Sequence, residues 1–205
     1  MPERVAGERP AVAAKERVLI EGCRAGEPHA LDELYRTHVG RVTRTIGRLV
    51  GPTPDLEDLV QTTFIEAIRS LARYRGEAAL ATWLVRIGVH VAQHHLRRGV
   101  RRTAPLEVLR PEEEPREPAT ADQVLDDRRL ALRVHALLDR ITPRKRIAFL
   151  LYTVEGHSIE EVAALMDAGH AATKSRIWFA RRELLALARL DPALRDLADG
   201  GKEPA

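Results

Sequence analysis

Basic and aromatic side chains occur together in two segments of the chain, and these residue types bind nucleic acid. The first segment runs from Tyr74 to Arg102, where four of the last six residues are arginine. The second lies between Lys174 and Arg182. Guanidinium and ammonium groups neutralise phosphates and bind guanine edges, whereas aromatic rings stack on unpaired bases. The first segment therefore suits single-stranded DNA, and the second suits the major groove of a duplex.

Helical periodicity explains how the second segment would present these groups. At about 3.6 residues per turn, Thr173, Ile177, Ala180 and Leu184 share one inward face. The predicted DNA-binding side chains fall on the side or the opposite face: Lys174, Ser175, Trp178, Arg181 and Arg182. In the first segment the predicted DNA-binding residues are Tyr74, Arg75, Trp83, Arg86, Arg97 and Arg98.

A purely structural explanation of the same residues stays open at this point. Any helical hairpin in an all-α protein has a solvated, charged outer face. Trp83, Trp178 and Phe179 could equally belong to the hydrophobic core, and the arginines from Arg97 onward could be a solvated helix end.

Helical spacing of apolar residues extends over nearly the whole chain, without the alternation that predicts strands. The first helix should contain Val18, Leu19 and Ile20 and end near Gly26, and the second should run from Leu31 to Leu49. A third helix has an apolar stripe from Leu56 to Leu71, with Pro54 in its first turn. A fourth begins near Thr82. This order puts Tyr74 and Arg75 in the turn between the third and fourth helices.

The C-terminal half predicts four more helices. The first contains the apolar residues from Leu130 to Ile141, and Thr142-Pro143 starts the second with an N-cap and a first-turn proline. The sequence Ser158-Ile159-Glu160-Glu161 has the pattern of a capping box and starts the third. A short turn containing Gly169 then precedes a basic helix from about Ala171 to Leu190. A short capped helix, a turn with glycine and a longer basic helix predict a helix-turn-helix.

Residues 103–122 break the helical pattern with four prolines and many acids. Between residues 105 and 127 there are eight acids and two arginines. Proline disfavours helix, and the acids repel one another. The predicted fold class is therefore all-α, with two small helical domains at residues 15–102 and 123–190. A flexible acidic linker at 103–122 joins them, and the second domain contains the helix-turn-helix.

Composition excludes several classes of protein. The 205 residues are 44% hydrophobic, enough to bury a core in one or two domains. The sequence has no bilayer-spanning apolar run and no signal-peptide pattern, so we expect a cytoplasmic protein. It has no glycine-rich phosphate loop and no zinc-type ligand spacing, so we expect no catalytic activity, no cofactor and no metal. His90 and His94 could share a metal ion, but the pattern supplies no third ligand.

The two halves together resemble the extracytoplasmic-function (ECF) sigma factors of bacterial RNA polymerase over about residues 15–190. The segments that carry the resemblance are Asp58-Leu59-Val60-Gln61-Thr62-Thr63-Phe64, Tyr74-Arg75-Gly76-Glu77, Thr82-Trp83-Leu84, Arg86-Ile87, Lys174-Ser175-Arg176-Ile177 and Ala180-Arg181. Their order on either side of an acidic linker is similar to the family's second and fourth regions.

The resemblance implies a sigma factor that binds core RNA polymerase and directs promoter-specific initiation. The third helix would bind the polymerase through Asp55, Asp58, Gln61 and Thr62. The turn from Tyr74 to Trp83 and the next helix would melt the minus-ten element. In that helix His90, which stands where the family often has Asn, is among the residues expected to contact DNA. The fourth region, including Arg176, would recognise the minus-thirty-five element. The implied partners are core polymerase, promoter DNA and an anti-sigma factor.

The sequence departs from the family pattern at a few positions that bear on promoter preference. Leu80 stands where Phe is usual, Ala171-Ala172-Thr173 replaces Gly-Thr-Val, and Phe179 occupies a position that is often basic. A one-component helix-turn-helix regulator is the alternative function, and it differs from a sigma factor in forming no complex with core polymerase.

Overall fold

The computed structural model describes residues 9–99 and 121–200, and every regular element in those ranges is helical. The elements are α1 Arg9–Ala25, α2 Pro28–Val50, α3 Leu56–Ser70, the 3₁₀ turn η1 Leu71–Arg73, α4 Leu80–Arg97, α5 Ala121–Leu138, α6 Pro143–Thr153, α7 Ile159–Leu165, α8 His170–Ala188 and α9 Arg195–Gly200. The all-α prediction is confirmed. In these ranges no helix is both long and apolar enough to cross a bilayer.

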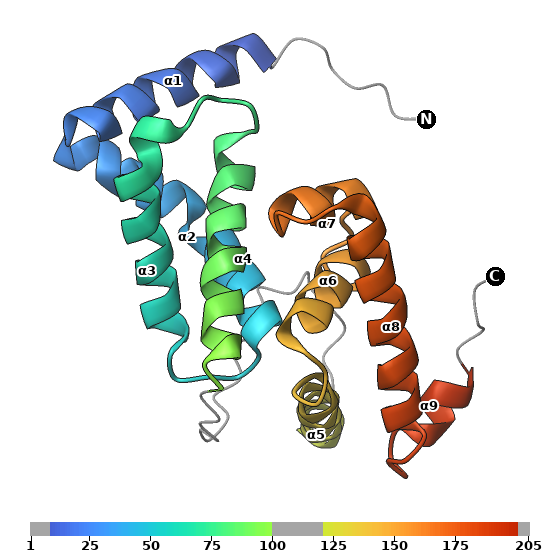
Figure 1. The fold of residues 1–205 in the computed structure, drawn as a ribbon. Helices are drawn as coiled ribbons and strands as arrows, with labels where there is room; N and C mark the ends of the chain where they lie inside the picture. The colour runs from blue at the N-terminus through green and yellow to red at the C-terminus, as the bar shows by residue number, and fades with distance from the viewer. Residues whose placement is uncertain (1–8, 100–120, 201–205) are drawn as a thin grey trace.

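The N-terminal unit consists of α1 to α4 (Figure 1). Helices α2, α3 and α4 pack against one another, and α1 packs along α2. Leu34, Val42 and Ile46 form the buried stripe of α2. Gly88 lets α4 approach this stripe closely, because a Cβ at that position would come within 3.3 Å of Ile46. These packed helices provide the frame that holds the first basic and aromatic segment.

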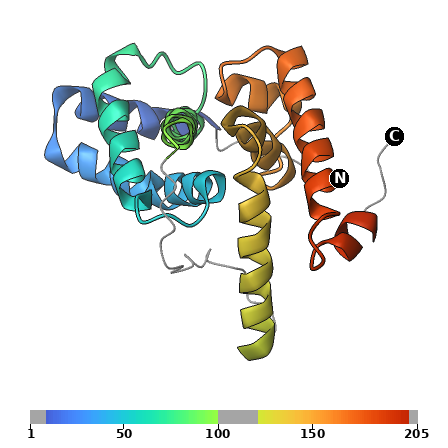
Figure 2. The ribbon, with the colours of Figure 1, turned by 60° about the horizontal axis from the view of Figure 1, so that its bottom comes forward.

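The C-terminal unit consists of α5 to α9, and α8 packs against both α6 and α7. In Figure 2, α5 extends away from the rest of this unit. The predicted capping box is confirmed at the start of α7. The Glu161 amide donates to Ser158 Oγ at 3.2 Å, and the Ser158 amide donates to Glu161 Oε2 at 2.8 Å. Residues Met166 to Gly169 separate α7 from α8.

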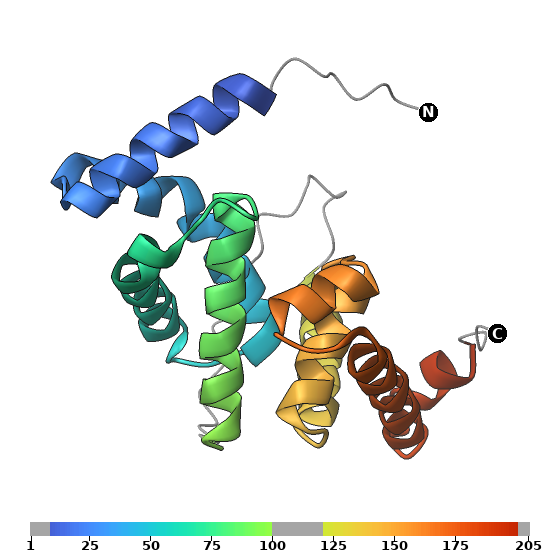
Figure 3. The same cartoon turned by 45° about the horizontal axis from the view of Figure 1, so that its top comes forward.

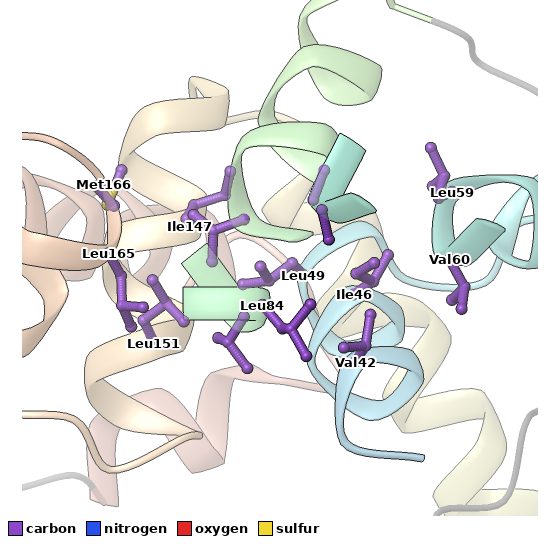
Figure 4. Close-up of a cluster of buried hydrophobic side chains, with 14 of the residues drawn as sticks. Val42, Ile46, Leu49, Leu59, Val60, Leu84, Ile147, Leu151, Leu165 and Met166 are labelled. Atoms are coloured by element: carbon purple, nitrogen blue, oxygen red, sulfur yellow. The ribbon is translucent and has the colours of Figure 1, made fainter. Parts of the chain in front are cut away.

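The two units share one hydrophobic core. Helix α4 packs against α6 and α7, and α2 packs against α6; Figure 3 shows α4 and α7 side by side. Leu49 of α2 and Leu84 of α4 lie on the side of the N-terminal helices that faces Ile147 and Leu151 of α6 (Figure 4). All four side chains are buried. The N- and C-terminal halves are therefore in direct contact, in addition to being joined by the chain.

A buried arginine also connects the units. Arg146 in α6 is 2% exposed, and its Nε donates to the Leu49 carbonyl at the end of α2 at 2.8 Å. Its guanidinium also pairs with Asp139. On the rim of the junction, Arg48 pairs with Glu155 at 2.7 Å. The buried charge is thus compensated by a carboxylate and a carbonyl oxygen, as burial of a guanidinium requires.

Several predicted boundaries differ from the structure. Helix α4 begins at Leu80, not near Thr82, and Pro54 lies in a turn before α3. Thr142 precedes the first-turn proline of α6 without a side-chain cap. The predicted linker ends inside α5, which begins at Ala121; residues 103–120 lie outside the described ranges. Helix α9 was not predicted.

Candidate nucleic-acid interface

Tyr74, which directly follows η1, and Trp83, in the first turn of α4, form an aromatic pair with ring centroids 5.0 Å apart. Tyr74 is 8% exposed, and its hydroxyl donates to the Ala78 carbonyl at 2.6 Å. Burial raises the pKa of Tyr74. Its ring therefore packs against Trp83 and supports the turn, and only a small part of it reaches solvent. Trp83 is half-buried.

A hollow of about 560 Å³ lies beside this pair. Arg73, Arg75 and Arg86 line it together with the two rings, and Glu77 is its one acidic residue. An aromatic floor with three guanidinium groups suits an unstacked base and its phosphates. The structure thus brings together four of the predicted residues of the first segment.

Helix α1 holds this turn in place from a distance in sequence. The Arg24 guanidinium donates to the carbonyls of Leu71 at 3.3 Å and Tyr74 at 2.6 Å. The Glu16 carboxylate accepts the Leu80 amide at 2.7 Å, at the first turn of α4. Our sequence analysis missed both residues. Their partners lie 47 to 64 positions away, so no local pattern could have identified them.

The next turns of α4 face the C-terminal unit. Arg86 pairs with the Asp167 carboxylate between α7 and α8, and His90 Nε2 lies 2.9 Å from the same carboxylate. The His90–Asp167 contact lacks the alignment of a hydrogen bond. Arg97 and Arg98 are exposed at the opposite end of α4. The predicted DNA-binding residues of α4 therefore fall into two groups. Arg86 and His90 contact the C-terminal unit, and Arg97 and Arg98 lie exposed at the far end of the helix.

His90 and His94 do not form part of a metal-type cluster. Across residues 9–99 and 121–200, no three His, Cys, Asp or Glu side chains are grouped as ligands would be. The neighbour of His90 is Asp167, and His94 is exposed.

Helix α8 has the inward and outward faces that its periodicity predicts. Thr173 and Ala180 are fully buried, and the Thr173 hydroxyl donates to the Gly169 carbonyl at 3.1 Å. The outward residues Lys174, Ser175 and Arg182 are exposed. Burial of the inward set fixes the rotation of the helix, so these polar side chains point away from the core.

The structure also settles the position of the α8 aromatics. Trp178 is 53% exposed and Phe179 is 45% exposed, so neither belongs to the core. Arg176 is half-buried. Arg181 lines an apolar groove of about 990 Å³ between α5, α6, α8 and α9, beside Ile177 and Leu184. Arg181 therefore lies on the side of α8, whereas Arg182 lies on its outward face.

Helix α3 presents a mixed stripe on its exposed face. Asp58, Gln61 and Thr62 are exposed, as predicted for residues that bind a partner. Ile65 at 48% and Ile68 at 42% exposure continue the same stripe at helical spacing. Asp55 precedes the helix as its N-cap residue. The sequence did not point to the exposed isoleucines, because apolar residues at helical spacing are usually expected to be buried. Their positions outside the face formed by Leu59, Val60 and Phe64 were the one sign of their exposure.

Comparison with known proteins identifies the family of the chain. Residues 34–102 match the Sigma-70 region 2 family, and residues 138–185 match the sigma-like domain of the response regulator PhyR. The ECF RNA polymerase sigma-E factor of Escherichia coli is 31% identical over 176 residues, which cover 82% of this chain and 92% of that protein. The ECF RNA polymerase sigma factor SigE of Mycolicibacterium smegmatis is 37% identical over 156 residues, which cover 75% of this chain and 59% of that protein.

Solved structures agree with this result. CnrH, solved in complex with the cytosolic domain of CnrY, has a TM-score of 0.60 and 26% identity, covering 86% of this chain and 98% of CnrH. The sigma factor RpoE of Bartonella quintana has the same fold, with a TM-score of 0.52 and 21% identity over 78% of this chain and 97% of RpoE. Because the sigma-E match covers 82% of this chain and 92% of that protein, the chain belongs to the ECF family of RNA polymerase sigma factors.

Proposed function

We propose that the chain binds core RNA polymerase in the cytoplasm and directs promoter-specific initiation, with the N-terminal unit melting the minus-ten element and the helix-turn-helix α7–α8 recognising the minus-thirty-five element. One observation carries the proposal. A single chain combines an aromatic–arginine hollow suited to an unstacked base with a helix whose outward side exposes Lys174, Ser175 and Arg182. A one-component regulator needs only the second of these.

The polymerase-binding surface in this proposal is the exposed stripe of α3. Its polar residues Asp58, Gln61 and Thr62 are followed along the helix by two exposed isoleucines, Ile65 and Ile68. Protein interfaces commonly combine an apolar centre with a polar rim. This composition supports a protein partner at α3 rather than DNA, because α3 contains three acids, Glu57, Asp58 and Glu66, and a single cation, Arg69.

Contact of α4 with DNA requires a change in the observed arrangement. Arg86 and His90 face Asp167 of the C-terminal unit. For both side chains to contact the minus-ten element, α4 and the α7–α8 turn must separate. We propose that the two units move apart when the chain is bound to polymerase and promoter.

An anti-sigma factor is the further proposed partner. CnrH was solved in complex with the cytosolic domain of another protein, and the apolar groove beside α8 in this chain offers a surface of the kind that an amphipathic helix covers.

The test is binding to core polymerase followed by promoter opening. The full chain should co-elute with core polymerase in size-exclusion chromatography. The complex should also make thymines of the minus-ten element reactive to permanganate, whereas neither component alone should. A chain that binds duplex DNA tightly and forms no complex with core polymerase would instead be a one-component regulator.

A further inference from the structure

Trp178 and Phe179 form an aromatic pair on the outer surface of α8. Their ring centroids are 4.9 Å apart in an edge-to-face arrangement, with an interplanar angle of 83°. Trp178 is 53% exposed and Phe179 is 45% exposed. Two neighbouring large rings in contact with solvent are costly unless a partner covers them.

Neighbouring cations hold both rings in position. The Arg182 guanidinium lies 5.3 Å from the centroid of the Trp178 ring, and Lys145 Nζ of α6 lies 5.6 Å from that of Phe179. Lys145 is itself anchored by Glu183 at 2.5 Å. The pair is thus a fixed surface of defined shape, since each ring packs against the other and against a cation.

The position of the pair on α8 places it on the outward side of the helix. The buried residues Thr173 and Ala180 define the inward direction. At about 3.6 residues per turn, Ser175 and Arg182 point almost directly away from the core, and Trp178 and Phe179 lie on either side of that direction. A groove that accepts the outward face of α8 therefore meets both rings.

The charge around the pair identifies the occupant. Arg182 and Lys145 lie against the rings, Lys174 is exposed one turn before Trp178, and Glu183, the single acid of α8, pairs with Lys145. An apolar centre enclosed by cations complements a polyanion with exposed apolar groups. Duplex DNA offers this combination in its major groove, where each thymine presents a C5-methyl group between two phosphate backbones.

We infer that Trp178 and Phe179 are specificity-determining residues that contact thymine methyl groups in the upstream promoter element. The inference rests on the proposed function and refines it. It predicts that the upstream element recognised by this chain contains at least one invariant A·T pair whose thymine is selected through its methyl group.

Replacement of thymine by deoxyuridine tests this directly, because it removes the C5-methyl and leaves every hydrogen-bonding group in place. The probe is a promoter fragment that core polymerase plus the full chain selects from a random-sequence library. Each upstream thymine is replaced individually by deoxyuridine, and holoenzyme affinity is measured by competition. At one or two positions the wild-type complex should lose about three- to fourfold in affinity, the effect of burying one methyl-sized group.

The Phe179→Ala and Trp178→Ala variants complete the test. Both residues are exposed, so the fold should persist, as circular dichroism will show. In at least one variant, the loss caused by deoxyuridine should disappear, because the coupling between side chain and methyl group is removed. Leu190→Ala, which truncates a residue that is 73% exposed just beyond the C-terminal end of α8, should keep the full deoxyuridine effect.

The possible outcomes separate this inference from the proposed function. Selective initiation that is insensitive to deoxyuridine at every upstream thymine, or a selected element without an invariant A·T pair, overturns the aromatic–methyl contact and leaves the sigma-factor function standing. Absence of any sequence-selective initiation overturns the proposed function itself.

Discussion

Asp167 has a backbone φ of 47°, and its carboxylate contacts two side chains of α4. Left-handed backbone is uncommon outside glycine, but Asp and Asn adopt it more readily than other residues. Asp167 therefore shapes the short turn before α8 and also contributes to the contact between the two units. Both Arg86 and His90, its partners, are predicted DNA-binding residues.

Asp167→Asn should increase the affinity of the free chain for a single-stranded minus-ten oligonucleotide. Asparagine tolerates the backbone conformation but lacks the negative charge that engages Arg86 and His90. Asp167, Arg86 and His90 are all about half exposed, so their contacts contribute little free energy. We therefore expect a gain in affinity of up to about fivefold, measured by fluorescence anisotropy. Asp199→Asn removes a remote carboxylate that pairs with Arg189 and is the matched control. An equal gain in both variants would show that only bulk charge had changed.

Ile65→Asp should weaken binding to core polymerase by about tenfold or more, the usual effect of losing an apolar anchor in an interface. The side chain is 48% exposed, so the fold should tolerate the change. Val18→Asp alters a residue of α1 that is 70% exposed and should leave polymerase binding unchanged. Unchanged affinity of the folded Ile65→Asp chain would remove α3 as the docking surface.

Individual residues could be predicted from the sequence where the determining interaction is local. The inward positions of Thr173 and Ala180 and the reciprocal bonds of Ser158 and Glu161 follow from helical spacing and from a four-residue pattern. Burial of Tyr74 could not be predicted in the same way, because its backbone is held by Arg24, 50 positions away.

At the level of elements, α7 depends most on its cap. It has seven residues, fewer than an isolated helix needs to be stable, and its first amides are satisfied by Ser158 and Glu161. Ser158→Ala should lower the free energy of unfolding by about 1 kcal/mol, measured by urea denaturation. Ser70→Ala, at the end of α3, removes a hydroxyl that bonds only to carbonyls of its own helix and should cost less. Equal costs would show that the cap contributes nothing specific.

Boundaries of elements were less predictable than their existence. Helix α4 begins two residues before the expected start, and Glu16 of α1 accepts the Leu80 amide there. Contacts between distant segments decide such ends, so the local pattern around Thr82 was insufficient. Helix α9 is short and packs on α8 with few apolar residues, which left no clear periodicity to recognise.

At the level of the whole molecule, the junction between the two units contains a histidine as well as Arg146. His135 of α5 lies against the backbone of Gly51, where a Cβ would come within 2.7 Å of its Nδ1. Burial lowers the pKa of His135, and the neighbouring Arg146 lowers it further. The folded chain therefore keeps this imidazole neutral at a pH where the unfolded chain protonates it.

Stability should consequently fall in mild acid. Below a pH of about 6.5, the ordinary pKa of histidine, the unfolded chain binds a proton that the folded chain does not, so the free energy of unfolding decreases as the pH drops toward the lowered pKa. His135→Gln should reduce this dependence, as measured by urea denaturation between about pH 5 and 8. The same slope in both proteins would contradict the assignment to His135.

The arrangement of the two units relative to each other was not predictable from sequence. Periodicity and the proline-rich segment predicted two domains, but the contact between the two units includes Arg146 and Leu49, which are 97 positions apart. Because the two units share a core, their separation on polymerase has to break these contacts.

Transcription from a random promoter library by core polymerase, with and without the full chain, tests the sigma-factor function most directly. With the chain present, sequenced transcripts should come from templates that share two sequence blocks at a fixed spacing, one upstream and one next to the start site. Lys174→Ala combined with Arg182→Ala should relax the upstream block and leave the downstream block intact. A transcript population identical to that of core polymerase alone would contradict the assignment of this chain as a promoter-selective sigma factor.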